Sequence, residues 1–533
     1  MFPRIVVSTL IGLALCVPPA DAQGTEREPH QDAALSAIVG DLQVQVEELR
    51  SQIETLTHEA EASKMEAAET RRQLQTTQAQ LAASSSSEAS NSNSLYAHSV
   101  GPTPNNAPEV ASIAEQVDLL SAKVNDQYQT KIESGSKYRV RISGLLLLNL
   151  FGNRGTVNNI ENPALAQPQD ELAPVKGTFG GSIRQTRLNF DAFGPTVFGG
   201  KSSGTLQMDF SGGFADRPGG STMGLLRLRT GVARIVWKDT SITAGQDGLF
   251  FLPVSPTSYA SMEEPEFSYA GNLWAWVPQL RVEHRVISFA GSDITIQAGI
   301  LDPASASIPN LDGSRLPSVG EQSRRPGVAS HLAWSRPVFG GKLSIGTGQY
   351  RSSQDWASGG IVTRVNSWLE SLDWNIPLSR WTSLSGIVFR GSALGEFGGG
   401  VGQNVFFSLP PSASPVVATG GSASTGVPKG LNTVGGWTQL KIMPVRRLEF
   451  NFGFGEDNPF ASQLERATAV QSYLNETPAR NQASFTNLIF HLRSDVLLSA
   501  EFRHLRTTPF SFTPPNEEPD SANHLNLAVG YLF

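Results

Sequence analysis

The chain has 533 residues, of which 39% are hydrophobic and 17% are charged, with a formal net charge of -7 at pH 7. Few charges combined with 51 glycines argue against a set of ordinary soluble domains, and the absence of a run of about 18 apolar residues beyond the N-terminal segment argues against a helical membrane protein. Residues 1–136 hold 8 basic and 18 acidic residues, whereas 137–533 hold the other 33 basic and 30 acidic residues, so the two parts are expected to differ in kind.

The first 22 residues have the features of a secretory signal peptide. Arg4 precedes an apolar stretch that ends at Cys16, and Ala20-Asp-Ala22 supplies small residues for cleavage after position 22. A short extension, residues 23–34, would follow. Because Cys16 is the only cysteine, the exported chain would have no disulfide and no thiolate metal site. A lipoprotein cut before Cys16 is a weaker alternative, since Leu15 is large where such sites have a small residue.

Residues 35–81 keep a heptad repeat, which predicts a coiled coil. Leucine recurs at one seam position, at Leu35, Leu42, Leu49 and Leu56. The other seam position holds mainly β-branched residues, at Val39, Val46, Ile53 and Ala60. This pattern favours a parallel dimer, but smaller residues later in the seam leave the oligomeric state open. Residues 82–108 are rich in Ser, Asn and Pro and predict a flexible linker. Residues 109–130 predict a second short helix, either a coiled coil or an amphipathic helix packed on the following domain.

From 138 to 533 the sequence predicts an all-β transmembrane barrel of about 16 antiparallel strands. Segments with period-2 alternation start near 138, 180, 200, 224, 240, 276, 292, 325, 341, 360, 380, 432, 447, 481, 496 and 523. Short and long connections alternate between them, as in outer-membrane barrels with tight periplasmic turns and long outer loops. The last strand alternates up to Phe533, which suits a sheet that closes on its first strand. Tryptophans near the short turns predict an interfacial girdle: Trp237, Trp334, Trp374 and Trp381.

Arginine dominates the polar side of these strands. An arginine facing lipid at mid-membrane costs about 2–4 kcal/mol, so the polar side is assigned to the lumen. The guanidinium fork suits carboxylate and phosphate. The alternative is that these arginines pair with carboxylates of the wall. The predicted pore-lining residues are Arg139, Arg141, Arg187, Arg227, Arg229, Arg281, Arg285, Arg364 and Arg503.

The third long connection contains Met262-Glu-Glu-Pro-Glu-Phe-Ser-Tyr269. It resembles the third outer loop of trimeric outer-membrane porins, which folds inward and often contains a Pro-Glu-Phe step, here Pro265, Glu266 and Phe267. The predicted constriction residues are Glu263, Glu264 and Glu266. A carboxylate-bearing loop opposite an arginine wall would select solutes by charge and size.

The order of segments is similar to that of the DcaP-like porins: signal peptide, coiled coil, Ser-rich linker, a Tyr138-Arg-Val-Arg-Ile-Ser-Gly144 opening and sixteen strands to a terminal Phe. The resemblance implies an outer-membrane homotrimer with a periplasmic coiled coil and passive uptake of small anionic solutes, often dicarboxylates. Its partners would be those solutes, outer-membrane lipid and peptidoglycan through the coiled coil, with no nucleic acid, metal or cofactor.

Two other functions are compatible with parts of this sequence. A structural tether between outer membrane and cell wall would use the same coiled coil and can coexist with transport. A barrel hydrolase needs a nucleophile beside a histidine, but the sequence has no Gly-x-Ser-x-Gly elbow and its histidines are scattered. The sequence therefore favours a channel that is not an enzyme.

Overall fold

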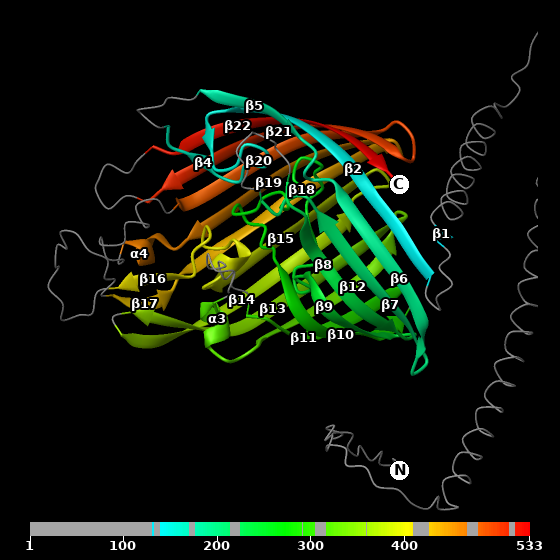
Figure 1. The fold of residues 1–533 in the computed structure, drawn as a ribbon, viewed down its shortest axis with the longest axis horizontal. Helices are drawn as coiled ribbons and strands as arrows, with labels where there is room; N and C mark the ends of the chain where they lie inside the picture. The colour runs from blue at the N-terminus through cyan, green and yellow to red at the C-terminus, as the bar shows by residue number, and fades with distance from the viewer. Residues whose placement is uncertain are drawn as a thin grey trace, which may run out of the picture. The chain divides into compact units, whose positions relative to one another are not determined.

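The computed structural model describes residues 131–132, 139–169, 176–213, 224–289, 291–303, 316–358, 360–408, 426–465, 478–510 and 518–533. They form a closed 16-stranded antiparallel β-barrel (Figure 1), which confirms the predicted fold class. The predicted signal peptide (1–22), coiled coil (35–81), linker (82–108) and second helix (109–130) lie outside the described residues. Within the described part of the chain, no helix is both long enough and apolar enough to cross a membrane.

The barrel strands follow one another around the sheet in chain order. The first half comprises β2 (Arg139–Arg154), β5 (Gly177–Ser182) with β6 (Arg187–Val197), β7 (Gly200–Asp209), β8 (Arg227–Val236), β9 (Thr240–Gly248), β10 (Trp276–Phe289), β11 (Ser292–Leu301) and β12 (Gly327–Val338). The second half comprises β13 (Gly341–Ser358), β14 (Ile361–Pro377), β15 (Thr382–Ser392), β18 (Asn432–Val445), β19 (Leu448–Pro459), β20 (Pro478–His491), β21 (Val496–Pro509) and β22 (Asp520–Leu532).

Short strands and single-turn helices lie in or near the connections between the barrel strands. They are β1 (Lys131–Ile132), β3 (Thr156–Val157), β4 (Ala166–Gln167), α3 (Val319–Gln322), the 3-10 helix η1 (Gly395–Phe397), β16 (Val405–Ser408), β17 (Val427–Gly430) and α4 (Ala461–Leu464). Ser318 caps α3 with a complete capping box, in which its hydroxyl accepts from the Glu321 amide and the Glu321 side chain accepts from the Ser318 amide.

The last strand closes the barrel on the first. β22 pairs antiparallel with β2, with Leu148 opposite Val529, and β2 pairs on its other side with β5 and β6. Closure leaves no unpaired sheet edge, which is what a lipid environment requires.

One predicted strand is interrupted. The segment expected from residue 180 divides into β5 and β6. β5 pairs with residues 149–154 of β2, and β6 pairs with residues 139–145 of the same strand. Arg184, Gln185 and Thr186 lie in the break and are buried. In this break the Thr186 hydroxyl accepts a hydrogen bond from the Leu147 amide.

Connections differ between the two ends of the barrel. At the turn end, consecutive strands join through a few residues, as between β6 and β7 at 198–199 or between β12 and β13 at 339–340. At the loop end, on the left in Figure 1, the connections are long, with one exception. β13 and β14 join there through residues 359–360, because these two strands, of 18 and 17 residues, continue beyond their neighbours.

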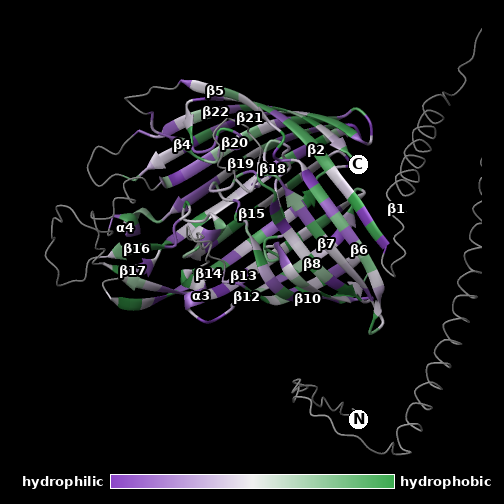
Figure 2. Cartoon of the chain, viewed as in Figure 1, coloured by the Kyte–Doolittle hydropathy of each residue, from purple (hydrophilic) through white to green (hydrophobic). Residues whose placement is uncertain are grey.

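Apolar and polar residues alternate along most strands (Figure 2), and many of the exposed strand residues are large apolar ones. On β22, Leu525, Leu527 and Val529 are about half exposed, while the alternate residues His524 and Asn526 are buried inside. Near the turn end, Trp334 and Trp374 both lie opposite Ile345 in the register, as an interfacial girdle requires. The alternation is the sequence signature of a wall with lipid on one side.

Candidate functional site

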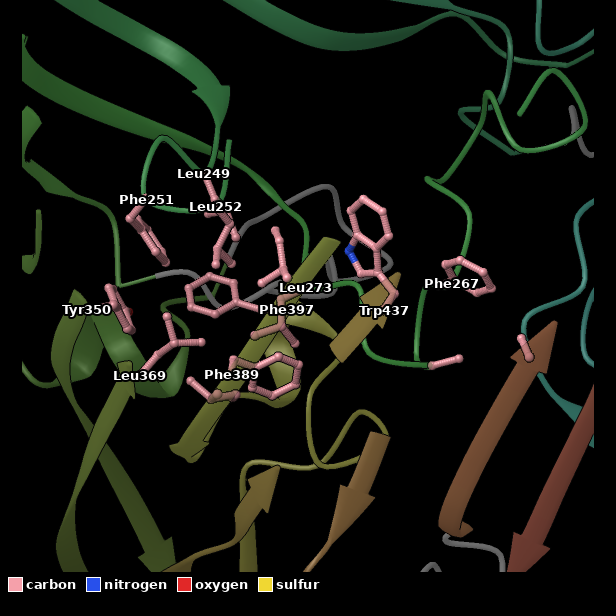
Figure 3. Close-up of a cluster of buried hydrophobic side chains, with 14 of the residues drawn as sticks. Leu249, Phe251, Leu252, Phe267, Leu273, Tyr350, Leu369, Phe389, Phe397 and Trp437 are labelled. Carbon is pink, nitrogen blue, oxygen red and sulfur yellow. The ribbon is translucent and has the colours of Figure 1, made fainter. Parts of the chain in front are cut away.

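The connection between β9 and β10, residues 249–275, folds into the barrel and is called the inner loop. Its first residues pack on the wall: the Phe251 ring stacks on Tyr350 at 5.4 Å between centroids and lies 6.1 Å from Phe397 (Figure 3). Further along, Phe267 lies against Trp437 and Phe485, at 6.3 and 5.2 Å. These contacts belong to one buried apolar cluster, so the inner loop is part of the barrel core rather than a surface segment.

The backbone of the inner loop is strained at the Pro-Glu-Phe step. Phe267 and Tyr269 have positive φ angles of 65° and 59°, a conformation that costs on the order of 1–3 kcal/mol in a residue other than glycine. Gly271 has φ 94°, and a Cβ there would lie 2.1 Å from the Gly436 carbonyl oxygen. The loop must therefore be held by its contacts, and its return to the wall needs glycine at 271.

Three arginines meet at one side of the inner loop and are called the arginine cluster: Arg187 from β6 and Arg227 and Arg229 from β8. Arg227 and Arg229 both pair with the fully buried Asp209 at the end of β7. The same two guanidinium groups lie 5.0 and 4.3 Å from the Trp276 ring centroid, within cation-π distance. Three guanidinium groups thus face one wall carboxylate.

The arginine cluster holds the inner loop through backbone oxygens. Arg187 and Arg229 donate to the Met262 carbonyl at 2.7 and 2.8 Å, and Arg227 donates to the Glu263 carbonyl at 2.9 Å. From the strand break, Gln185 accepts from the Met262 and Glu263 amides at 2.6 and 3.0 Å. Because these oxygens are neutral, the positive charge of the cluster is not cancelled by them.

On β21, Arg503 is the centre of a second group, called the Arg503 network. Arg503 pairs with Glu266 of the inner loop and, at 2.9 Å, with Glu501 of its own strand; all three side chains are almost fully buried. Arg503 also donates to Ser261 of the inner loop and, at 2.7 Å, to the Pro163 carbonyl of the first long connection. The Arg503 guanidinium therefore pairs with two carboxylates and hydrogen-bonds to both the inner loop and the first long connection.

Burial changes the acidity of the three loop carboxyls. It raises the pKa of Glu263, raises the pKa of Glu264 to about 7, and raises the pKa of Glu266 to about 8. The neighbouring Glu263 adds to the effect at Glu264, and Arg503 opposes it at Glu266 without cancelling it. A single guanidinium group shared with Glu501 cannot compensate two buried carboxylates.

The remaining predicted arginines lie away from the inner loop, apart from Arg281, which pairs with Asp247 at 2.8 Å and lies 5.8 Å from the Phe250 ring. Near the turn end, Arg139 is exposed, Arg141 pairs with Asp191 at 2.9 Å, and Arg285 pairs with Asp239. By strand alternation these four face the interior. Arg364 instead faces outward near the loop end, paired with Asp355 at 2.8 Å.

Sequence reasoning did not single out Asp209 or Gln185. Asp209 alternates with Gln207 on the polar side of β7, so the parity of that strand was a usable signal. Gln185 lies in a strand break that the period-2 pattern does not reveal. Both residues position the arginine cluster against the inner loop.

A closed barrel with an apolar outer wall, a polar interior and an inward-folded third long connection defines the class of outer-membrane β-barrels with the porin fold. No protein-family model matches the chain, and no curated protein matches its sequence. Among solved structures, the outer membrane channel DcaP of Acinetobacter baumannii matches 75% of this chain and 99% of its own, with 13% identity and a TM-score of 0.54. The anion-selective porin from Comamonas acidovorans matches 74% of this chain and 100% of its own, with 11% identity and a TM-score of 0.43.

The likeness to DcaP establishes a shared fold. At 13% identity it carries no substrate and no oligomeric state to this chain. The chemistry of transport has to come from the arginine cluster, the Arg503 network and the inner loop.

The raised pKa of Glu266 predicts a pH-dependent inner loop. A carboxyl whose pKa is about 8 in the docked loop, against 4.5 in water, holds its proton more tightly when docked. Docking is then strongest below pH 4.5 and weakens as the pH rises towards 8. We expect the current noise of single channels in planar bilayers to increase between pH 5 and 8. Glu266→Gln should remove part of this dependence and leave the part carried by Glu264, whose pKa is also raised, to about 7. A wild-type noise level that falls with rising pH would contradict the prediction.

Proposed function

We propose that this protein is an outer-membrane porin, a passive diffusion channel for small hydrophilic solutes with a preference for anions such as carboxylates. The observation that carries the proposal is that the inner loop packs inside the barrel against three wall arginines, which share a single wall carboxylate, Asp209. Uncancelled guanidinium groups beside a constricting loop offer charge-assisted hydrogen bonds to an anion and repel a cation.

The wall itself lowers the expected strength of that preference. Most arginines outside the cluster are paired with carboxylates, as in Arg141–Asp191, Arg281–Asp247 and Arg285–Asp239. Pairs of this kind contribute little net charge to the lumen. The preference is therefore assigned to Arg187, Arg227 and Arg229 rather than to the whole arginine-rich wall.

Conductance tests the proposal directly. The full-length protein, reconstituted into liposomes, should allow swelling in small neutral sugars and should give stepwise currents in planar bilayers. A barrel that serves only as a tether between membrane and cell wall would give neither signal. A sealed barrel in both assays, with folding verified by heat-modifiable gel mobility, would reject the channel.

We further propose that the channel is a homotrimer, with residues 35–81 in the periplasm as a self-associating coiled coil that can also contact peptidoglycan. The heptad of Leu35 to Ala60 supports self-association. Sedimentation equilibrium of the 35–81 fragment should show an oligomer, and pull-down with purified peptidoglycan should retain the full-length protein. A monomeric fragment would remove the coiled coil from assembly.

A further inference from the structure

A groove of about 460 Å³ lies where β12, β13 and β14 approach the loop end. Its lining includes Arg325, Arg351, Ser353, Asn366 and Trp368. None of these residues contacts the inner loop or the arginine cluster in the described structure. The groove is thus separate from the candidate transport site.

The strand register places this groove on the outer face of the barrel. Tyr350 pairs with Leu369 in the register, and both are buried inside against Phe251. The next pair, Arg351 with Trp368, must point the other way, because side chains alternate along a strand. Ser353 and Asn366, two residues further, point outward as well.

The groove begins in the upper half of the apolar wall and rises towards the outer headgroup region. Arg351 lies six residues along β13 from Ile345, which stands opposite Trp334 and Trp374 at the turn-end girdle. For strands tilted by about 40° this is a rise of roughly 15 Å, within an apolar band about 25 Å tall. Ser353 and Asn366, two residues further along, add a rise of roughly 5 Å, and the long Arg351 side chain can extend towards the polar headgroups.

The groove carries positive charge on an aromatic support. The Arg351 guanidinium lies 5.6 Å from the Trp368 ring centroid and pairs with Glu370 at 2.8 Å. Exposed Arg324 and Arg325 lie at the rim, and both act on the nearby Asp355, which pairs with Arg364. Four arginines against two carboxylates leave this patch basic on a surface that elsewhere faces lipid chains.

We propose that this groove binds the phosphorylated headgroup of an outer-leaflet glycolipid. Arg351, fixed by its aromatic and carboxylate contacts, and Arg325 would donate to phosphate oxygens, for which the guanidinium fork is well suited. Ser353 and Asn366 would offer hydrogen bonds to the attached sugar. The acyl chains would lie on the apolar wall below, where Leu332 and Leu372 are nearly half exposed. The proposal depends on the outer-membrane location and not on conductance.

The full-length protein in detergent would be titrated with three probes: an acylated disaccharide bisphosphate, its dephosphorylated form and inorganic phosphate. Native mass spectrometry would count the bound lipid. We expect the wild type to retain the bisphosphate, and Arg325→Gln/Arg351→Gln to weaken retention by about tenfold. Removing the lipid phosphates should weaken binding to a similar extent, and millimolar inorganic phosphate should not displace the lipid.

Arg480→Gln is a matched control. Arg480 pairs with one carboxylate, Glu456 at 2.8 Å, as Arg351 pairs with Glu370, and its side chain is 46% exposed against 48% for Arg351. It does not line the groove. Equal losses in the control and the double variant would overturn the proposal, as would unchanged retention in the double variant or displacement by inorganic phosphate. Arg325→Gln alone changes only an exposed connection, so a partial loss there would support the site even if the double variant folded poorly.

These outcomes are independent of the transport proposal. Lipid retention by a barrel that does not conduct would leave the groove intact and reject the channel. Conduction without selective lipid retention would support the channel and reject the lipid site.

Discussion

Replacing Arg503 by methionine is expected to release the inner loop and to raise single-channel conductance. The change removes the cation from between Glu266 and Glu501 and deletes the hydrogen bonds to Ser261 and to the Pro163 carbonyl. Above pH 8, where Glu266 is ionised, removing one partner of this buried ion pair costs about 3–5 kcal/mol. If most of that cost falls on docking, the docked population decreases by about a hundredfold or more.

A double variant separates loss of docking from general misfolding. In Arg503→Met/Glu266→Gln the loop no longer buries a carboxylate without a partner, so part of the docking should return and conductance should decrease towards the wild-type value. Arg480→Met, which removes a half-exposed arginine outside the network, should leave conductance unchanged. An Arg503→Met channel with wild-type conductance and wild-type noise would show that the apolar contacts of Phe251 and Phe267 hold the loop without the ion pairs.

Removing two charges from the arginine cluster should move the channel from anion towards cation preference. In Arg187→Gln/Arg227→Gln the buried Asp209 keeps Arg229 as its partner, so Asp209 is not left without a cation. The local balance changes from three guanidinium groups against Asp209 to one. With each charge worth roughly 1 kcal/mol to a passing ion, the permeability ratio should change by about fivefold per charge.

Reversal potentials under a salt gradient measure this change. Arg227→Gln/Asp209→Asn is the control, because it removes one charge of each sign and disturbs the same hydrogen bonds. Its ion preference should stay close to that of the wild type. A wild type that prefers cations, or a double arginine variant with unchanged reversal potential, would refute anion preference carried by this cluster and would show that the cluster serves only to hold the inner loop.

The architecture could be predicted from sequence because lipid imposes it locally. Wherever a strand crosses an apolar layer, a charge on the outer side costs about 2–4 kcal/mol, so alternate residues must be apolar and the period-2 pattern is strict. That constraint determined the strands, the short turns, and the inward side of Arg187, Arg281 and Arg503. It does not apply to the loop ends of β13 and β14, which continue past their neighbours, and Arg364 there points outward beside Asp355.

The site was decided by the tertiary structure, because its members are brought together by sheet register and loop packing across long stretches of sequence. Arg503 meets Asn162 across 341 residues and Ser261 across 242. The β5–β6 break places Gln185 under the inner loop, and no period in the sequence marks it. The sequence could identify arginines that face a lumen and a loop rich in glutamate. Only the fold could show that Asp209 and the wall carboxylates pair with most of those arginines, since a partner on a neighbouring strand is set by register and not by spacing along the chain.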